Sequence, residues 1–341
     1  MISNKITSVS VVIPTFNGKD WLEKTIKEIE KSLVYAKIKQ AEIVIIDDGS
    51  TDNTFEVAKS IKTNFEKNVY TQKNQGRFEA RKAGTKKAKY DYILFVDTRV
   101  FIGEESLAYI LKNYSEPDRA VWCSHVRIDK IGNIYARFWE AVVFIAWRKY
   151  FSNPRDISYG LKGFDDYPKG TTCFFVPKKV MKEANDWFET KTHNPKASND
   201  DTLLLRKVAE TSNINISPEY WCTYHARTAF KQYVKHVYHR GKVFVDGFFR
   251  LDGNKYVWVI SLFLMVSLGL LITIILRPHL IPSLLLIGLA LWALEFVVLL
   301  FYRLEFKDML SLFILTPVFI LFYGLGIWNG FLTIVSNKLN K

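Results

Sequence analysis

The stretch IVIIDDGSTD, residues 43–52, carries the strongest fold signal in this chain. Its apolar first half, residues 43–46, predicts a short strand buried on both faces. The strand runs into Asp47 and Asp48, and the Asp-Gly step that follows is typical of a tight turn. The Ser, Thr and Asp residues after the turn are typical helix caps, and they predict a helix over about 52–63.

Strands and helices alternate through the first hundred residues, with four strands and three helices. Apolar runs and helical spacing predict strands at 9–13, 43–46, 69–70 and 92–96, and helices at 19–34, 52–63 and 76–88. Short connections between alternating strands and helices indicate a mainly parallel sheet that helices cover on both faces. Ligands of such sheets bind beyond the carboxyl ends of the strands. Residues 14–17, the pair Asp47 and Asp48, and Asp97 all follow strands, so we expect them at one edge.

The order of elements after residue 100 is harder to predict. We expect a helix at 104–112, strands at 120–127 and 171–176, and a helix at 200–210. Residues 138–150 are aromatic and apolar, and two interpretations stay open: core, or a helix that lies on a membrane. The last helix begins at a second acidic cluster, SNDDT, residues 198–202.

An apolar tail follows from about residue 257. Segments 257–276, 280–302 and 310–335 are each long enough to cross a bilayer, which takes about 20 apolar residues. The short link between the first two predicts a tight hairpin, and Pro317 with the Gly324 and Gly326 pair leaves a re-entrant last segment open. Glu295 lies inside the second segment, where a carboxylate is costly; it is either functional or merely tolerated.

The charges are distributed unevenly. Residues 257–341 hold five Lys or Arg and three acids, which leaves 42 basic and 31 acidic residues in 1–256, a net charge of +11. A basic domain beside a membrane anchor is attracted to anionic lipids. Residues 228–249 mix Lys, Arg and His with aromatic residues, as interfacial helices do. Nucleic acid is not expected as a partner, because no basic run or nucleic-acid motif stands out.

The cysteines and the N-terminus bear on the compartment. Three scattered cysteines without a Cys-x-x-Cys pair predict reduced, mostly buried thiols, as in a cytosol-facing domain. The first residues enter a strand without an apolar signal-peptide core, so we do not expect export of this domain. The basic residues before 257 favour a cytoplasmic N-terminal domain.

Five segments, taken together, resemble glycosyltransferase family 2, whose inverting enzymes have the GT-A nucleotide-sugar fold. They occur in the family's order and lie within residues 9–240: VVIPTFN (11–17), IIDDGSTD (45–52), NQGRFEARKAG (74–84), LFVD (94–97) and NDDT (199–202). The resemblance implies an α/β fold with a Rossmann-like, mainly parallel sheet. It implies a catalytic domain at 1–226, which would be followed by an interfacial helix region at 227–256 and a transmembrane domain at 257–341.

The resemblance also implies roles for individual residues. Asp201 would be the catalytic base and Asp200 would shape the acceptor site. The residues that would contact the nucleotide-sugar donor are Pro14, Thr15, Asn17, Asp47, Asp48, Gly76, Arg77, Arg81 and Arg99. Without the family context, the acids would be explained as a helix cap and a strand-to-turn signal, and the pair Arg77 and Arg81 as a solvated basic face.

One position departs from the family pattern. The family's metal motif usually reads Asp-x-Asp, and this chain has Asp97-Thr98-Arg99. A divalent ion, Mg²⁺ or Mn²⁺, would then rely on Asp97, phosphate oxygens and a distant ligand such as His225. Alternatively, Arg99 itself neutralises the diphosphate. For His225, a hydrogen-bonded structural role is the favoured alternative to a metal ligand.

The resulting hypothesis is a multi-pass cell-membrane glycosyltransferase whose catalytic domain faces the cytoplasm. It would move one sugar from a UDP- or GDP-sugar to a membrane-associated acceptor, either a polyprenyl-linked saccharide or an envelope glycan. A single transfer is expected because Gln232-x-x-Lys235-His236 lacks the Arg and Trp of the Gln-x-x-Arg-Trp signature of processive synthases. Two alternatives stay open: a polyprenyl-phosphate sugar synthase of the dolichyl-phosphate mannose synthase type, and an inactive membrane scaffold that retains the fold.

Overall fold

The computed structural model describes residues 6–189, 196, 198, 200–249 and 256–339. Within these residues the chain forms two compact units. Unit 1 comprises residues 1–129, 147–190 and 200–226, and unit 2 comprises residues 130–146, 191–199 and 227–341, both over their described parts. Residues 130–146, which include most of the ambiguous segment 138–150, group with the C-terminal helices.

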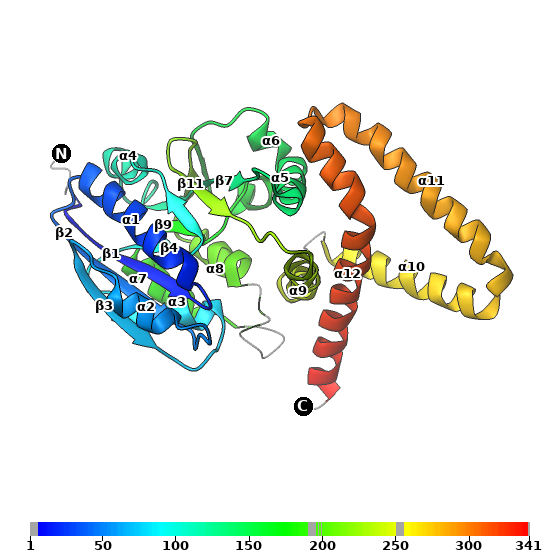
Figure 1. The fold of residues 1–341 in the computed structure, drawn as a ribbon, viewed down its shortest axis with the longest axis horizontal. Coiled ribbons are helices and arrows are strands. Elements are labelled where there is room, and N and C mark those ends of the chain that lie inside the picture. The colour runs from blue at the N-terminus through cyan, green and yellow to red at the C-terminus, as the bar shows by residue number, and fades with distance from the viewer. Residues whose placement is uncertain (1–5, 190–195, 197, 199, 250–255, 340–341) are drawn as a thin grey trace. The chain divides into compact units, whose positions relative to one another are not determined.

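Unit 1 is built on an eight-stranded sheet (Figure 1) with the strand order β3-β2-β1-β4-β9-β6-β10-β8. The pairs β1–β2, β2–β3, β1–β4 and β6–β10 are parallel, while β9 runs antiparallel to β4 and β6, and β8 antiparallel to β10. This mainly parallel sheet confirms the predicted fold class. The strands are β1 Ser8–Thr15, β2 Gln40–Asp47, β3 Glu66–Thr71, β4 Tyr92–Val96, β6 Val121–Cys123, β8 Ile157–Tyr159, β9 Cys173–Pro177 and β10 Ile214–Ile216.

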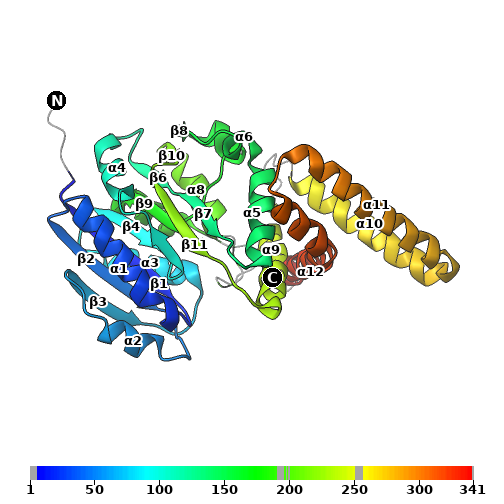
Figure 2. The ribbon, with the colours of Figure 1, turned by 45° about the horizontal axis from the view of Figure 1, so that its top comes forward.

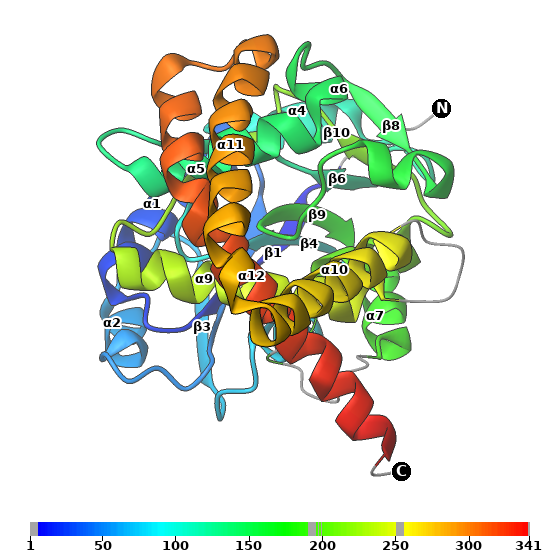
Figure 3. The ribbon, with the colours of Figure 1, turned by 90° about the vertical axis from the view of Figure 1, so that its right-hand side faces the viewer.

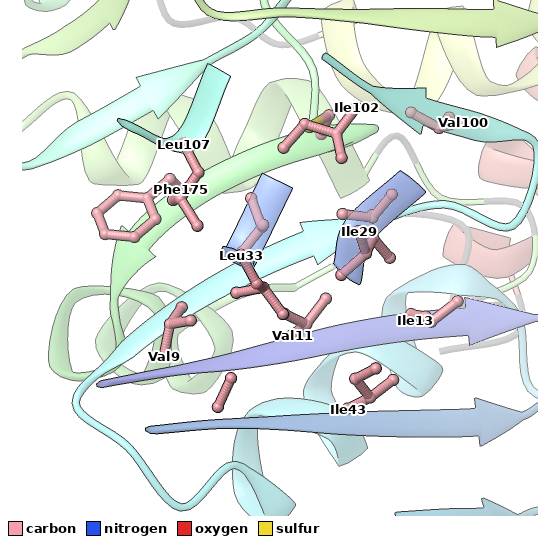
Figure 4. Close-up of a cluster of buried hydrophobic side chains, with 14 of the residues drawn as sticks. Val9, Val11, Ile13, Ile29, Leu33, Ile43, Val100, Ile102, Leu107 and Phe175 are labelled. Carbon is pink, nitrogen blue, oxygen red and sulfur yellow. The ribbon is translucent and has the colours of Figure 1, made fainter. Parts of the chain in front are cut away.

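Helices cover both faces of this sheet, because side chains alternate along each strand. Val9, Val11 and Ile13 of β1 pack with α1 and α4 on one face (Figure 4), whereas Val12 packs with α3, α7 and α8 on the other. All four valine and isoleucine side chains are fully buried. The helices of unit 1 are α1 Lys19–Tyr35, α2 Thr54–Ser60, α3 Arg77–Lys87, α4 Ser106–Asn113, α6 Arg148–Phe151, η1 Leu161–Asp166, α7 Lys178–Trp187 and α8 Asp200–Val208.

A second sheet of three strands completes unit 1 (Figure 2). Its order is β5-β11-β7, with β5 Val100–Ile102, β11 Trp221–His225 and β7 His125–Asp129. The single strand expected at 120–127 is therefore two strands in different sheets. The change occurs at Ser124, whose N–H still bonds Cys173 O, whereas the N–H of His125 bonds Tyr220 O.

Unit 2 is helical (Figure 3). Its elements are α5 Ile134–Ala146, α9 Phe230–Phe248, α10 Tyr256–Leu276, η3 Pro278–Leu280, α11 Ile281–Leu299, η4 Leu300–Tyr302 and α12 Phe306–Leu339. Three helical stretches are long and apolar enough to cross a membrane: Tyr256–Leu276, Pro278–Tyr302 and Phe306–Asn337. They lie close to the three predicted spans. The hairpin differs from the expectation, because α10 and α11 diverge from η3 (Figures 1 and 3). Apart from Glu295 in α11, both helices are apolar on all sides, as helices that lie in lipid are.

Glycines bring α9 and α12 into backbone contact. A Cβ built on Gly241 would lie 2.1 Å from Tyr323 O, and one on Gly326 would lie 2.2 Å from Tyr238 O. Small residues permit this close approach of two helices. The α12 helix continues through Pro317 and past this crossing. A re-entrant last segment at Pro317 and the Gly324 and Gly326 pair was left open by the sequence; in the structure α12 is continuous there, and Gly326 packs against α9.

Buried charges join α5 to the start of α12. The Asp308 carboxylate, 4% exposed, accepts a hydrogen bond of 2.7 Å from Lys130 Nζ and another of 2.7 Å from Arg137 Nη1. Glu305 lies 3.0 Å from the same Lys130 ammonium. Buried carboxylates need such partners, so this network fixes the α5 segment within unit 2.

Candidate active site

The predicted edge residues of β1, β2 and β4 lie side by side in the structure. Thr15 at the end of β1 pairs with Asp47 at the end of β2, and the next N–H, that of Asp48, bonds Thr15 O at 2.9 Å. After β4, the hydroxyl of Thr98 donates to Pro14 O at 3.0 Å. The parallel register therefore brings three separate sequence motifs to one edge of the large sheet.

Asn17 connects the turn after β1 to the turn after β2. Its N–H donates to Ser50 Oγ at 2.9 Å, and its Oδ1 accepts from the Thr51 N–H at 2.8 Å. Asn17 has a positive φ of 50°, a conformation that Asn tolerates better than most residues. In this structure the side chain shapes the edge, and its expected contact with a donor stays a prediction.

Asp47 and Asp48 are both buried and hydrogen-bonded. The Asp48 carboxylate accepts from Gln72 Nε2 at 2.8 Å and from the N–H groups of Gln75 and Gly76 at 2.9 and 2.7 Å. Asp47 accepts from Thr71 Oγ1 at 3.1 Å and from the Ser50 N–H at 3.3 Å. These bonds hold the loop that leads into α3, so Asp48 positions the N-terminus of the helix that carries Arg77 and Arg81. Direct contacts of either carboxylate with a nucleotide stay predictions.

Arg81 is the centre of the site. Its side chain is completely buried, so Arg81 is not part of a solvated basic face, which was the alternative explanation for the two arginines of this helix. Arg77, one turn earlier, is exposed. The Arg81 guanidinium donates from Nη2 to Asp97 Oδ1 at 2.8 Å and from Nη1 to Asp201 Oδ1 at 3.2 Å. The two carboxylates, separated by more than a hundred residues in sequence, thus share one cation.

Asp201 lies in the first turn of α8 and its side chain is 30% exposed. Besides Arg81, it has a close hydrogen bond from the hydroxyl of Thr171, a fully buried residue just before β9. Sequence reasoning missed Thr171, because a threonine at a strand start has no distinguishing signal. Asn199 and the side chain of Asp200 lie outside the described residues, so the expected role of Asp200 stays a prediction.

Arg99 and His225 lie next to each other, because the His225 N–H bonds Arg99 O at 3.0 Å. The Arg99 guanidinium lies over the ring of Trp21 at 5.1 Å, and the His225 ring stacks on the same tryptophan at 5.0 Å. His225 Nδ1 is 2.9 Å from Asp129 Oδ2, while Nε2 is buried and has no hydrogen-bond partner among the residues that the structure describes. A carboxylate often orients the imidazole of a histidine that binds a metal, but a structural histidine forms the same hydrogen bond.

The residues around Asp97 match a divalent ion poorly. One oxygen of Asp97 is occupied by the Arg81 guanidinium, and Arg99 adds a second cation two residues later. Divalent magnesium and calcium sites take about six or more oxygen ligands. No group of three or more His, Cys, Asp and Glu side chains that could hold a metal occurs among the residues described. The roles of Asp97 and His225 as metal ligands stay predictions.

The three cysteines are buried and reduced. Burial raises the pKa of the Cys123 thiol to about 12, so it is unreactive at neutral pH.

Comparison with known proteins identifies the family to which this architecture corresponds. Residues 10–194, more than half of the chain, match the model described as Glycosyl transferase family 2. The poly-β-1,6-N-acetyl-D-glucosamine synthase of Staphylococcus aureus strain MSSA476 is 30% identical over 112 residues, which are 33% of this chain and 26% of the relative. An uncharacterized glycosyltransferase of Haemophilus influenzae is 34% identical over 112 residues, 31% of this chain and 43% of that protein. The match to these curated relatives thus spans less than half of their length.

One of the similar solved structures supports the fold. The mannosyltransferase PcManGT from Pyrobaculum calidifontis, in complex with GDP-Man and Mn²⁺, has a TM-score of 0.51 at 16% identity, over 70% of this chain and 62% of that one. TarS of S. aureus in complex with UDP-GlcNAc has a TM-score of 0.49 at 16% identity, over 73% and 68%.

Proposed function

This chain belongs to glycosyltransferase family 2, and we propose that it transfers one sugar from a nucleoside-diphosphate sugar to a membrane-associated acceptor, with inversion. The observation that carries the proposal is the placement of Asp97 and Asp201 on the single buried guanidinium of Arg81. Two acids from distant segments are thereby held at the edge where nucleotide ligands of α/β sheets bind.

Asp201 is the proposed base. Inverting transfer needs a carboxylate that takes the proton of the acceptor hydroxyl while its oxygen attacks the anomeric carbon. The bonds from Thr171 and Arg81 both reach Oδ1 of Asp201, so they fix the orientation of the carboxylate. A base held in this way needs little rearrangement when the acceptor arrives.

The leaving diphosphate needs cations. Arg77 is exposed at the first residue of α3, where the helix N-terminus also favours an anion, and Asp48 holds that terminus in place. Arg99, in place of the family's second acid, adds a guanidinium near the end of β4. We propose that these groups neutralise the growing charge on the diphosphate. A divalent ion bound by the donor's own phosphates would share that task.

The acceptor is proposed to be lipid-linked or part of an envelope glycan. Support comes from the three helices that are long and apolar enough to cross a membrane. The basic residues before the first of these helices favour a cytoplasmic location for unit 1. We propose UDP-GlcNAc as the first donor to test, because one relative is named as a synthase of an N-acetylglucosamine polymer.

The experiment measures donor hydrolysis and transfer by the purified full chain in nanodiscs. UDP- and GDP-sugars are tested with and without Mn²⁺, and the length of the product distinguishes one transfer from polymer synthesis. Asp201→Asn should lower kcat by at least about 100-fold if Asp201 is the general base. The matched control is Asp186→Asn, which changes an exposed acid on α7 and should leave kcat within about twofold.

Three results would contradict the proposal. Unchanged transfer by Asp201→Asn excludes Asp201 as the base. A merely weakened reaction, with polyprenyl phosphate as the acceptor, favours the polyprenyl-phosphate sugar synthase, because an ionised phosphate needs no base. Absence of nucleotide binding under every metal condition favours the inactive scaffold.

A further inference from the structure

A small group of charges beside Asp201 contains one cation more than its acids can pair. Arg206 at the end of α8 donates from Nη2 to both carboxylate oxygens of Asp165, at 2.9 and 3.1 Å. Lys149 binds Asp166 at 3.0 Å. Lys169 forms no ion pair among the described residues, and its ammonium donates a hydrogen bond of 2.9 Å to Tyr167 O. The group therefore carries a surplus positive charge at Lys169.

The Lys169 ammonium is held in a largely apolar setting. It lies 4.4 Å from the centre of the Phe164 ring, and the Arg206 guanidinium lies 4.6 Å from the same ring. Phe164 is completely buried. Cation–π contacts offset only part of the cost of burying an ammonium. A lysine in such a place needs an anion for full compensation.

The electrostatics agree with this geometry. The pKa of Lys169 is lowered to about 8, mainly by burial and to a smaller extent by the Arg206 charge, whereas Asp165, Asp166 and the Cys123 thiol act in the opposite direction. Because both acids are bound to other cations, their influence is too small to restore the usual value of this pKa. A partly buried amine with a lowered pKa is frequent at functional sites.

Lys169 also lies close to the proposed base. It precedes Thr171 by two residues, and Thr171 bonds Asp201. The pKa of the Cys123 thiol is affected by the backbone of the intervening Gly170 and by the charges of both Lys169 and Asp201. Lys169 therefore belongs to the segment that contacts Asp201 through Thr171, whereas Asp48 and Gly76 belong to the loop before α3.

We propose that Lys169 is an anion-binding residue that takes a phosphate or carboxylate group of the acceptor while Asp201 faces the acceptor hydroxyl. The location on the acceptor side rests on the proposed function; the anion site itself does not. Binding of an oxyanion supplies the missing counter-charge and completes the hydrogen bonding of the ammonium. The acceptor would accordingly be an anionic molecule, such as a lipid phosphate or an acidic glycan.

Sulfate is the probe, because its charge stays constant over the pH range used. The full chain in detergent is labelled by ¹³C-methylation of its lysines, and sulfate binding is followed through the NMR signal of Lys169. This signal is identified by its loss in Lys169→Arg. Sulfate binding should weaken about 30-fold between about pH 7 and about pH 9.5, since an amine with a pKa near 8 is then mostly neutral. Isothermal titration of the unlabelled chain measures the same change.

Two variants separate charge from structure. Lys169→Met should bind sulfate at least about tenfold more weakly at pH 7 and lose the pH dependence. Lys169→Arg, which keeps its charge at high pH, should bind sulfate at both pH values. Equal sulfate binding by the unaltered chain at both pH values, or by Lys169→Met and the unaltered chain, overturns the anion site.

Transfer kinetics then test where the anion belongs. Lys169→Met should raise KM for an acceptor that carries a phosphate or carboxylate at least about tenfold, while KM for a neutral acceptor and kcat stay the same. An unchanged KM for both acceptors overturns the acceptor assignment. Sulfate binding at Lys169 without any sugar transfer by the unaltered chain contradicts the proposed function and leaves the anion site standing.

Discussion

Replacing Arg81 with methionine should destabilise unit 1 more than any other single change at this edge of the sheet. Arg81→Met leaves the carboxylates of Asp97 and Asp201 without their shared cation. Loss of one partner from a buried ion pair costs about 3–5 kcal/mol. Because Asp97 is 21% and Asp201 is 30% exposed, water screens part of this effect, and we expect about 2–3 kcal/mol. For a domain of this size the unfolding midpoint should fall by about 5–10 °C.

The assay is thermal unfolding of the full chain in detergent, followed by tryptophan fluorescence. Arg77→Met, on the same helix but exposed, is the matched control and should change stability by less than about 0.5 kcal/mol. The double variant Arg81→Met, Asp97→Asn should recover part of the loss, because it removes one uncompensated charge. Equal midpoints for Arg81→Met and Arg77→Met, or no recovery in the double variant, would refute the reasoning.

Two further predictions concern unit 2. Gly241→Ala should destabilise the crossing of α9 and α12 by about 1–3 kcal/mol, because the added Cβ would meet Tyr323 O. The control is Gly288→Ala, where the added Cβ meets open space. Equal thermal midpoints for the two variants would contradict this prediction. Glu140→Gln should stabilise the protein at pH 7 by about 1 kcal/mol or less, because burial raises the pKa of this carboxyl and its ionised form is disfavoured. The gain is present above the raised pKa and disappears as pH falls below the usual value, so denaturant unfolding at pH 7 and pH 4 should differ; a gain of equal size at pH 4 argues against it.

Residue patterns predicted strands β1 to β4 and β9 of the large sheet, but not β8 or β10. The strand at 43–46 is the inner part of β2, and the predicted helix at 76–88 is α3 within a residue at each end. Local periodicity suffices there, because both faces of a parallel strand are buried. The expected strand at 120–127 was wrong as a single element, since the chain changes sheets at Ser124 through bonds to distant strands.

The sequence predicted several residues of the candidate site, but it did not predict which side chains and backbone groups they contact. Edge residues such as Asp47, Asp48 and Asp97 could be placed, because the carboxyl ends of parallel strands share one edge. Their hydrogen-bond partners could not be predicted from the sequence, since Asp48 binds backbone N–H groups of the loop before α3 and Asp97 binds Arg81. Thr171 shows the same limit: its role depends on Asp201, which lies 30 residues away.

Composition and periodicity alone determined that this chain has an α/β sheet, acidic residues at the carboxyl ends of its strands and three apolar helices of membrane-spanning length. These properties are local, because each depends on neighbouring residues and on the repeat of the strand or helix. The three-dimensional packing decided that Arg81 is buried between Asp97 and Asp201, that α5 joins the C-terminal helices, and that Lys169 has no carboxylate partner among the described residues. Such pairings are set by which distant segments meet, and the free energy of a charge depends on its neighbours in space rather than in sequence.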